Sequence, residues 1–215
     1  MRLFCRKIKD LVFVAIIASL SVFVACSSSD RDLADPALIT ADSLIQSGID
    51  NDSIEWYITE YGIENVIAED TGIRYALTKE GNGEIPDYND IVSVEYTGKF
   101  LNNKVFDTTI EDIAVDAGID IEGRVYTPLR FNFTQDGSGI SSSFLPQFRN
   151  GLKKVLSMTD DNDARIFTKG SKALLFMPSA VAYGVRGDQY YDQYEDNIPP
   201  NTVLIFEFTL VTFRP

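Results

Sequence analysis

From Gly72 to its end, the chain consists of short strand-like runs separated by glycine, proline and asparagine. The runs predicted as strands are Ile73–Leu77, Ile91–Tyr96, Arg130–Phe133, Lys172–Met177 and Val203–Phe213. One amphipathic helix is expected among them, from Pro146 to about Ser157, because its apolar residues recur every three or four positions. Many strands, short connections and one central helix predict an α+β domain, in which an antiparallel sheet packs on that helix.

An N-terminal helical extension, residues 42–71, is expected before this domain. The pair Asp52 and Glu55 predicts a capped helix start, apolar residues follow at helical spacing, and Gly62 is expected to end the helix. A short helix over residues 42–47 is expected ahead of it. Two roles remain open for the helix that contains Trp56: it is either a dimerisation arm or an element that packs against the domain.

Residues 1–25 have the composition of a processing segment. Four basic side chains precede an uncharged, mostly apolar run from Leu11 to Ala25. The run is shorter than the ~20 residues needed to span a bilayer, and it ends at small residues. Residues 23–26, Phe-Val-Ala-Cys, resemble a bacterial lipobox. The resemblance implies a lipoprotein signal peptide, with lipid transfer to the thiol of Cys26 and cleavage just before it. The alternative is an ordinary secretory signal with a chance cysteine.

Lipidation of Cys26 determines the predicted location. Removal of residues 1–25 also removes Cys5, so the mature chain would have neither a free thiol nor a disulfide. Each buried methylene of an acyl chain contributes ~0.8 kcal/mol, so two or more chains anchor a protein stably. The polar residues 26–41 are predicted to be the lipidated tether. We therefore expect the cell envelope of a Gram-negative-type bacterium, with the outer membrane, on its periplasmic or surface face, as the anchoring site.

Charge and composition exclude several functions. The sequence has 19 Lys and Arg against 32 Asp and Glu, a net charge of −13, so no nucleic-acid partner is expected. It has no histidine, which excludes Ser-His-Asp and Cys-His catalysis and histidine-based zinc sites. The acidic run at residues 160–163 lacks the spacing of a calcium loop, so no metal site is expected. No carboxylate spacing supports a glycosidase.

A series of short motifs runs in order through the second half of the chain. The motifs are Val94–Gly98, Val105–Thr109, Phe131 with Phe133, Phe144–Leu152, Gly170–Lys172, Met177–Pro178, Ala182–Gly184, and Ile198–Asn201 followed by Leu204–Phe206. Over residues 72–215 the chain resembles the FKBP family of peptidyl-prolyl cis-trans isomerases. The resemblance implies an FKBP-like sheet wrapped on one helix, proline-containing polypeptides as partners, and no cofactor. It also implies macrolide immunophilin ligands.

The resemblance assigns site roles by position. It implies that the catalytic residues are Tyr96, Phe106, Asp107, Tyr183 and Phe206. It implies that the substrate-binding residues are Leu129, Phe144, Leu145, Phe148 and Ile198. In this assignment Asp107 orients the Tyr96 hydroxyl, while the Leu145 N–H and the Tyr183 hydroxyl face substrate carbonyls. Taken singly, each aromatic is also explained by core packing, and Asp107 by a turn or capping role.

Prolyl isomerisation is compatible with a chain that lacks histidine. Rotation about an X-Pro bond crosses a barrier of ~18–20 kcal/mol because the transition state loses amide resonance. No covalent bond is made or broken, so no nucleophile or metal is needed, and a dry aromatic pocket favours the twisted amide. We therefore expect an isomerase acting on exported proteins. The alternative is a non-catalytic FKBP-like chaperone or binding module at the membrane, which Phe148 in place of the usual Trp and Leu129 in place of an aromatic would favour.

Two loops are predicted to be longer than in a minimal member of the family, and a third contains a repeat. Residues 110–127 form an acidic insertion, and residues 159–169 lengthen the connection after the predicted helix. Residues 188–194 form a small tyrosine-rich repeat. Its side chains Tyr190, Tyr191 and Tyr194 either contact residues that flank the substrate proline or belong to a solvated loop.

Overall fold

A computed structural model describes residues 36–188 and 198–215 of this chain, with side chains from residue 42 onward. The predicted signal peptide, Cys26 and most of the predicted tether lie outside these ranges, as do Tyr190, Tyr191 and Tyr194. Residues 39–215 form one compact unit. Among the helices described, none combines the length and the apolar character that crossing a bilayer requires.

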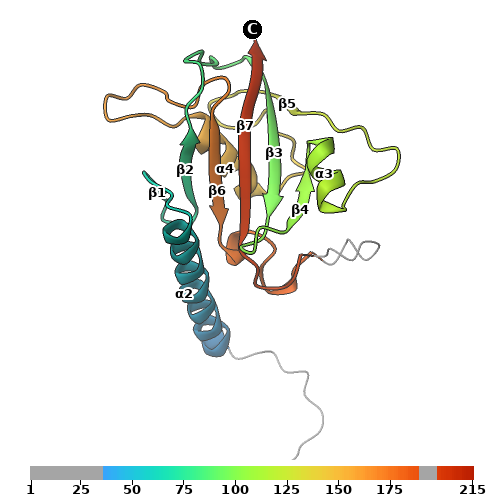
Figure 1. The fold of residues 1–215 in the computed structure, drawn as a ribbon. Helices are drawn as coiled ribbons and strands as arrows, with labels where there is room; N and C mark the ends of the chain where they lie inside the picture. The colour runs from blue at the N-terminus through green and yellow to red at the C-terminus, as the bar shows by residue number, and fades with distance from the viewer. Residues whose placement is uncertain (1–35, 189–197) are drawn as a thin grey trace, which may run out of the picture. The chain divides into compact units, whose positions relative to one another are not determined.

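The strands form one antiparallel sheet of seven members, in the order β1-β2-β6-β7-β3-β4, with β5 also paired to β3 (Figure 1). The strands are β1 (Ile67–Ala68), β2 (Arg74–Lys79), β3 (Ile91–Lys99), β4 (Val105–Thr108), β5 (Leu129–Asn132), β6 (Lys172–Met177) and β7 (Leu204–Arg214). Strands β4 and β5 share one edge of β3, because β5 pairs with Ile91–Val94 and β4 with Thr97–Lys99. The predicted antiparallel sheet is confirmed.

Helix α4 (Pro146–Leu156) packs on one face of the sheet (Figure 1). Its proline lies in the first turn, where a backbone N–H would have no acceptor within the helix, so the missing N–H costs no hydrogen bond. A Cβ at Gly151 would lie 2.4 Å from Leu175 Cδ2 on β6, so only glycine lets the helix come this close to the strand. The predicted α+β architecture, a sheet wrapped on one central helix, is confirmed.

Helix α2 (Pro36–Glu60) packs on the opposite face of the sheet. Its buried residues Ile54 and Tyr57 form a second cluster with strand residues Leu174, Phe176 and Ile205. Neighbouring residues on these strands belong to the cluster under α4, because successive strand side chains point to opposite faces. The helix therefore packs against the domain, as one of its two predicted roles requires, while the Trp56 side chain is 56% exposed.

The prediction of two separate helices in this region is wrong. Residues 36–60 form one continuous helix that begins inside the predicted tether and passes through Asp52, the expected helix start. Glycine, isoleucine, aspartate and asparagine at positions 48–51 have low helix propensity, which favoured a break in the sequence pattern. Packing of the next turn against the sheet stabilises the helix in spite of this propensity.

One helix and two of the strands were not expected from the sequence, and β4 is one of those strands. Helix α3 (Glu111–Ala117) lies within the acidic insertion and ends at Gly118, whose φ is 70° and whose N–H donates to two carbonyls of the last turn. The expectation of a single helix after Gly72 is therefore wrong. Only Ala114 of α3 is buried, so the helix leaves almost no periodic signal. Strand β1 also pairs with β2, so the sheet begins before the boundary predicted at residue 72.

Candidate active site

Aromatic rings from several elements gather on the face of the sheet that α4 covers. They are Tyr96 on β3, Phe106 on β4, Phe144 before α4, Phe148 in α4 and Phe206 on β7. The Phe148 ring is at the centre, with its centroid 4.9 Å from those of Phe144 and Phe206 and 5.7 Å from that of Tyr96. The Phe106 ring lies 5.7 Å from Phe206. These separations are those of interacting aromatic pairs.

The position of the Phe106 ring depends on a glycine in the neighbouring strand. Gly98 of β3 pairs with Asp107 of β4. A Cβ at Gly98 would lie 2.6 Å from Cζ of Phe106, closer than any side chain allows. Glycine at this position therefore lets the Phe106 ring lie across β3 and reach Phe206.

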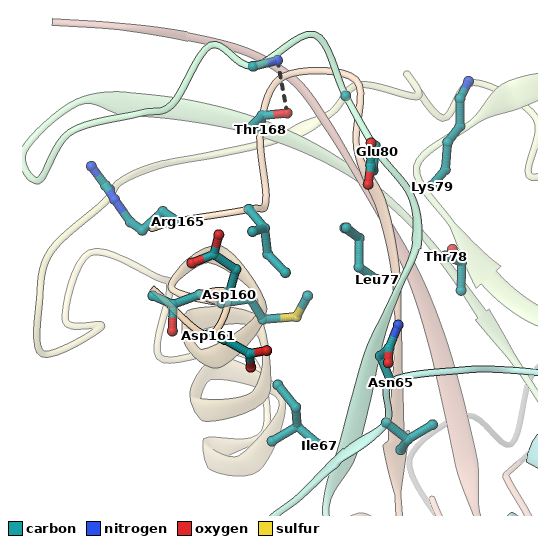
Figure 2. Close-up of a pocket in the computed structure, with 16 residues that line it drawn as sticks. Asn65, Ile67, Leu77, Thr78, Lys79, Glu80, Asp160, Asp161, Arg165 and Thr168 are labelled. Carbon is teal, nitrogen blue, oxygen red and sulfur yellow. Dashed lines mark hydrogen bonds between the residues drawn. The ribbon is translucent and has the colours of Figure 1, made fainter. Parts of the chain in front are cut away.

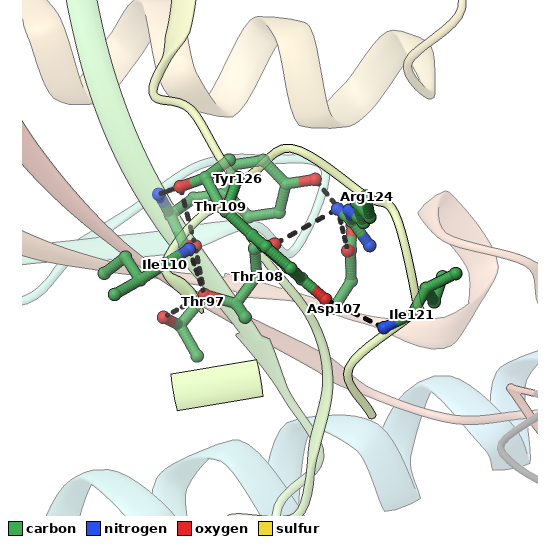
Figure 3. A network of polar contacts seen from close by, with 9 residues as sticks. Thr97, Asp107, Thr108, Thr109, Ile110, Ile121, Arg124 and Tyr126 are labelled. Atoms are coloured by element: carbon green, nitrogen blue, oxygen red, sulfur yellow. Dashed lines mark hydrogen bonds and ion pairs between the residues drawn. The ribbon is translucent and has the colours of Figure 1, made fainter. Parts of the chain in front are cut away.

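The carboxylate of Asp107 is held on both of its oxygens (Figure 3). The Tyr96 hydroxyl donates to Oδ2 at 2.5 Å, and Nη2 of Arg124 donates to Oδ1 at 3.1 Å. The same Nη2 lies 3.1 Å from the carbonyl oxygen of Thr108. The Asp107 and Arg124 side chains are each 35% exposed, so the ion pair is only partly screened by water. The Tyr96 hydroxyl is therefore hydrogen-bonded to the Asp107 carboxylate, and the part that Asp107 plays in the site stays a prediction.

Arg124 belongs to the acidic insertion and was not predicted as a site residue. Its Cζ lies 4.8 Å from the ring centroid of Tyr126, a cation–π arrangement. Burial acts to lower the pKa of Arg124, but the hydrogen bond and the charge of Asp107 outweigh it and raise that pKa above its ordinary value. The sequence does carry one signal, since Arg124 is the only basic residue between positions 110 and 127.

Threonines after Asp107 fix the backbone of Tyr96. The Tyr96 N–H donates to Oγ1 of Thr109 at 2.9 Å, and the Thr109 N–H donates to the Tyr96 carbonyl at 3.0 Å. The Thr108 hydroxyl donates to the same carbonyl at 3.0 Å and lies 3.1 Å from the hydroxyl of Thr97 (Figure 3). The Val-Phe-Asp-Thr-Thr motif therefore places an aromatic ring, a carboxylate and two backbone supports around one tyrosine.

The other predicted site residues lie against the same hydrophobic core. Ile198 is buried in it, and Leu129, Leu145 and Tyr183 are partly buried against it. Leu145 directly precedes α4, and within residues 36–188 and 198–215 no hydrogen bond uses its N–H as a donor. Tyr183 lies between two short 3-10 helices, η1 (Ser179–Val181) and η2 (Gly184–Arg186). Two further aromatic residues were not predicted as site residues. The Phe100 ring contacts that of Phe106, and the Phe208 ring contacts that of Phe148.

A cavity of about 900 Å³ lies elsewhere, between β2 and the loop after α4 (Figure 2). Its lining includes Leu77, Lys79, Asp160, Asp161, Arg165 and Thr168, and none of the predicted site residues. The carboxylate of Asp160 accepts the N–H groups of Ala164 and Asn162 at 2.9 Å, which lowers the pKa of that carboxyl. In the described ranges no cluster of three or more histidine, cysteine or acidic side chains is arranged to hold a metal.

Comparison with known proteins identifies the family. A family model described as "FKBP-type peptidyl-prolyl cis-trans isomerase" matches residues 83–211. The chain belongs to this family. The matched range includes every residue predicted for the pocket, from Tyr96 to Phe206.

The FKBP-type relatives differ from this chain in length. FkpA of Escherichia coli strain K12 is 28% identical over 164 residues, which cover 75% of this chain and 44% of that protein. The chain thus spans less than half of that relative. FK506-binding protein 1 of Dictyostelium discoideum is 25% identical over 143 residues, or 66% of this chain and 99% of that protein. The crystal structure of E. coli FkpA aligns with a TM-score of 0.44 at 22% identity, covering 100% of this chain and 84% of that one.

Proposed function

We propose that this protein catalyses the cis-trans isomerisation of X-Pro peptide bonds in exported polypeptides. The observation that carries the proposal is the hydrogen bond from Tyr96 to Asp107 beside the aromatic cluster of Phe106, Phe148 and Phe206. Membership of the FKBP-type family supports the same reaction. A tyrosine–carboxylate pair beside aromatic rings suits recognition of a neutral, ring-shaped side chain with carbonyl groups on either side.

In the proposed mechanism the aromatic rings receive the proline ring of the substrate. The twisted amide has less charge separation than the planar amide, so a site with little water favours it. The Leu145 N–H, which has no acceptor among the described residues, is available to a substrate carbonyl. Lowering the barrier by about 7 kcal/mol would accelerate rotation on the order of 10⁵-fold. No proton is transferred, so no histidine is required.

Asp107 acts in this mechanism by positioning and by its charge. Its carboxylate holds the Tyr96 hydroxyl in one orientation, and Arg124 holds the carboxylate. The negative charge is therefore fixed at one edge of the pocket before the substrate binds, which is the arrangement that electrostatic stabilisation of a transition state requires. We assign the Tyr183 hydroxyl to the second substrate carbonyl.

A protease-coupled isomerisation assay on residues 36–215 tests the proposal. We expect the chain to accelerate isomerisation of Xaa-Pro peptides, and Asp107→Ala to lower kcat/KM at least about tenfold, because the Tyr96 hydroxyl loses its acceptor. Asp112→Ala is the control, since Asp112 is an exposed acid that follows β4 in the acidic insertion. Circular dichroism of each variant verifies that it is folded.

The same assay separates the isomerase from the binding module. A wild-type rate equal to the uncatalysed rate, with retained binding of proline-containing peptides, would establish the non-catalytic alternative. We also propose that a macrolide immunophilin ligand occupies the aromatic pocket. Such a ligand is expected to inhibit the wild type in competition with the peptide, and Phe206→Ala is expected to weaken its binding.

We further propose that the mature protein is lipid-anchored through Cys26 in the cell envelope, at the outer membrane. The lipobox-like residues 23–26 and the short apolar run before them support this. In a bacterial host, the wild type should incorporate radiolabelled palmitate and fractionate with membranes. Cys26→Ser should do neither while it keeps isomerase activity. Label in the Cys26→Ser variant would rule out this lipidation site.

A further inference from the structure

A buried aspartate connects the N-terminal helix to the segment that carries Tyr183. Asp50 of α2 is 2% exposed, and its Oδ2 accepts two hydrogen bonds from Ser179: one from the backbone N–H at 2.8 Å and one from the hydroxyl at 2.6 Å. Its Oδ1 accepts a third from Nε2 of Gln46 at 2.7 Å. The aspartate and the serine are 129 residues apart in the sequence. None of the pocket assignments uses this contact.

The helix that carries Asp50 is itself held firmly on the sheet. One turn after Asp50, Ile54 is fully buried in the cluster on the outer face of the sheet. Tyr57 is 4% exposed, and its hydroxyl donates to Oδ1 of Asn103 at 2.7 Å. Arg74 of β2 makes an ion pair with Glu55 at 3.2 Å. Asp50 therefore presents its carboxylate from a fixed support.

Ser179 begins the segment that leads to Tyr183. It is 1% exposed and is the first residue of η1. The Ser179 carbonyl accepts the N–H of Ala182 at 3.0 Å, which directly precedes Tyr183. At the other end, the Gly184 carbonyl accepts the N–H of Asn201 at 2.8 Å. The Tyr183 segment is thus fixed at two points, and one of them is Asp50.

We propose that Asp50 is a positioning residue for Tyr183, so that α2 forms part of the working structure of the site. This inference rests on the proposed isomerase function. The first N–H groups of a helix have no partner within it, and a carboxylate is a strong, charge-assisted acceptor for such a group. Here the acceptor is Asp50, which belongs to α2 and not to η1. A displacement of α2 would therefore move η1, and Tyr183 with it.

Because both Asp50 and Ser179 are buried, water cannot replace either partner of their hydrogen bonds. A carboxylate that is nearly inaccessible to water requires hydrogen-bond partners, and here Ser179 and Gln46 supply them. Truncation of Asp50 would in turn leave the N–H and hydroxyl of Ser179 buried without an acceptor. The start of η1 would then move toward water or toward another acceptor, and the Tyr183 hydroxyl would move with it.

A double-mutant cycle distinguishes positioning of Tyr183 from a general loss of stability. We expect Asp50→Ala to lower kcat/KM about tenfold in the wild type but less than about twofold in a Tyr183→Phe background, where no hydroxyl remains to be misplaced. Ser179→Ala removes only the hydroxyl bond and should give a smaller loss, about threefold, with the same dependence on Tyr183. It also serves as the test variant if Asp50→Ala does not fold.

Amide hydrogen exchange gives a measurement that does not depend on activity. Asp50→Ala should accelerate exchange at Ser179 and Ala182, whereas the control Asp52→Ala, at an exposed position of the same helix, should not. Losses in kcat/KM that multiply with Tyr183→Phe, or unchanged exchange at both amides, would overturn the proposal. A wild type without isomerase activity would instead refute the proposed function. In that case the exchange data would still decide whether Asp50 holds this segment.

Discussion

At the scale of single residues, the central feature is a carboxylate with two unlike partners. Asp107 accepts a neutral hydroxyl from Tyr96 on one oxygen and a cation from Arg124 on the other. The hydrogen bond from the Tyr96 hydroxyl is short, at 2.5 Å, so it fixes the orientation of the two side chains relative to each other. The guanidinium also donates to the Thr108 carbonyl, so it holds the carboxylate relative to the backbone of β4.

Replacing Arg124 should reduce activity more than stability. In Arg124→Met the carboxylate keeps Tyr96 but loses its second anchor, so we expect kcat/KM to fall about five- to tenfold with a change in unfolding free energy below about 1 kcal/mol. Arg130→Met, at an exposed position on β5, is the control. The prediction is checked by the isomerase assay and urea unfolding of both variants. Equal losses in the two variants would show that Arg124 has no special role.

Enlarging the central ring of the cluster should destabilise the domain. The Phe148 side chain is 3% exposed, and its ring has Phe144 and Phe206 at 4.9 Å and Phe208 at 5.6 Å. Phe148→Trp would therefore overpack the site, and urea unfolding should show a loss of about 1–3 kcal/mol. Phe213→Trp, near the end of β7 where the ring is only partly buried against the core, should change it by less, under about 1 kcal/mol. Unchanged stability of Phe148→Trp together with higher kcat/KM would show that the site has spare room.

The family motifs in the sequence give positions for the pocket residues, and the sheet brings several of these positions together. Tyr96, Phe106, Phe148 and Phe206 do belong to one cluster. Arg124 and Asp50 could not be predicted in the same way. The path of the insertion that returns Arg124 to Asp107, and the pairing of a helix residue with Ser179, depend on tertiary contacts that leave no local periodicity.

At the scale of elements, a network of three polar side chains connects the β1–β2 hairpin to helix α4. Glu69, in the turn between β1 and β2, accepts the hydroxyl of Tyr75 at 2.9 Å and Nζ of Lys154 in α4 at 3.0 Å. The hydrogen bond from Lys154 lowers the pKa of Glu69 below its ordinary value. Burial, together with the Glu69 carboxylate, raises the pKa of Tyr75.

The lowered pKa of Glu69 predicts that the stability of the folded chain depends on pH. Because the pKa of Glu69 is lower in the folded chain than its ordinary value of 4.5, its contribution is present above that pH and is lost as the pH falls through the folded value. Glu69→Gln should therefore lower the unfolding free energy at pH 7 and flatten its decline between about pH 5 and pH 3. Urea unfolding over a pH series measures this, with exposed Glu64→Gln as the control. An unchanged slope in Glu69→Gln would contradict the prediction.

Apart from β1 and β4, the strands were easier to predict than the helices in this chain. Along β7, Leu204, Phe206, Phe208 and Leu210 alternate and all belong to the cluster under α4, because a strand has one short period. Helix α2 was predicted in two pieces, since its stability comes from residues of β6 and β7 that lie far along the chain. Helix α3 was missed because it buries one alanine only.

At the scale of the whole compact unit, the sheet carries a hydrophobic cluster on each face. The cluster under α4 contains the aromatic site, and the one under α2 contains Leu174, Phe176 and Ile205. The two clusters alternate along β6 and β7, so each strand is buried on both sides where they overlap. The family match begins at residue 83, yet the unit that buries these strands begins at residue 39. Helix α2 is therefore expected to be part of the folding unit.

Removing α2 tests this expectation. A chain of residues 63–215 would expose the outer faces of β6 and β7, and we expect an unfolding free energy about 3–5 kcal/mol below that of residues 36–215, since burial of one large apolar side chain contributes about 1.5–3 kcal/mol. The variant Ile54→Ala in the longer chain should show a smaller loss, about 2–3 kcal/mol, because it removes one side chain from the same cluster. Thermal and urea unfolding of the three proteins provide the comparison. Equal stability of the long and short chains would mean that the outer cluster adds nothing to folding, and α2 would then serve only to hold Ser179 through Asp50.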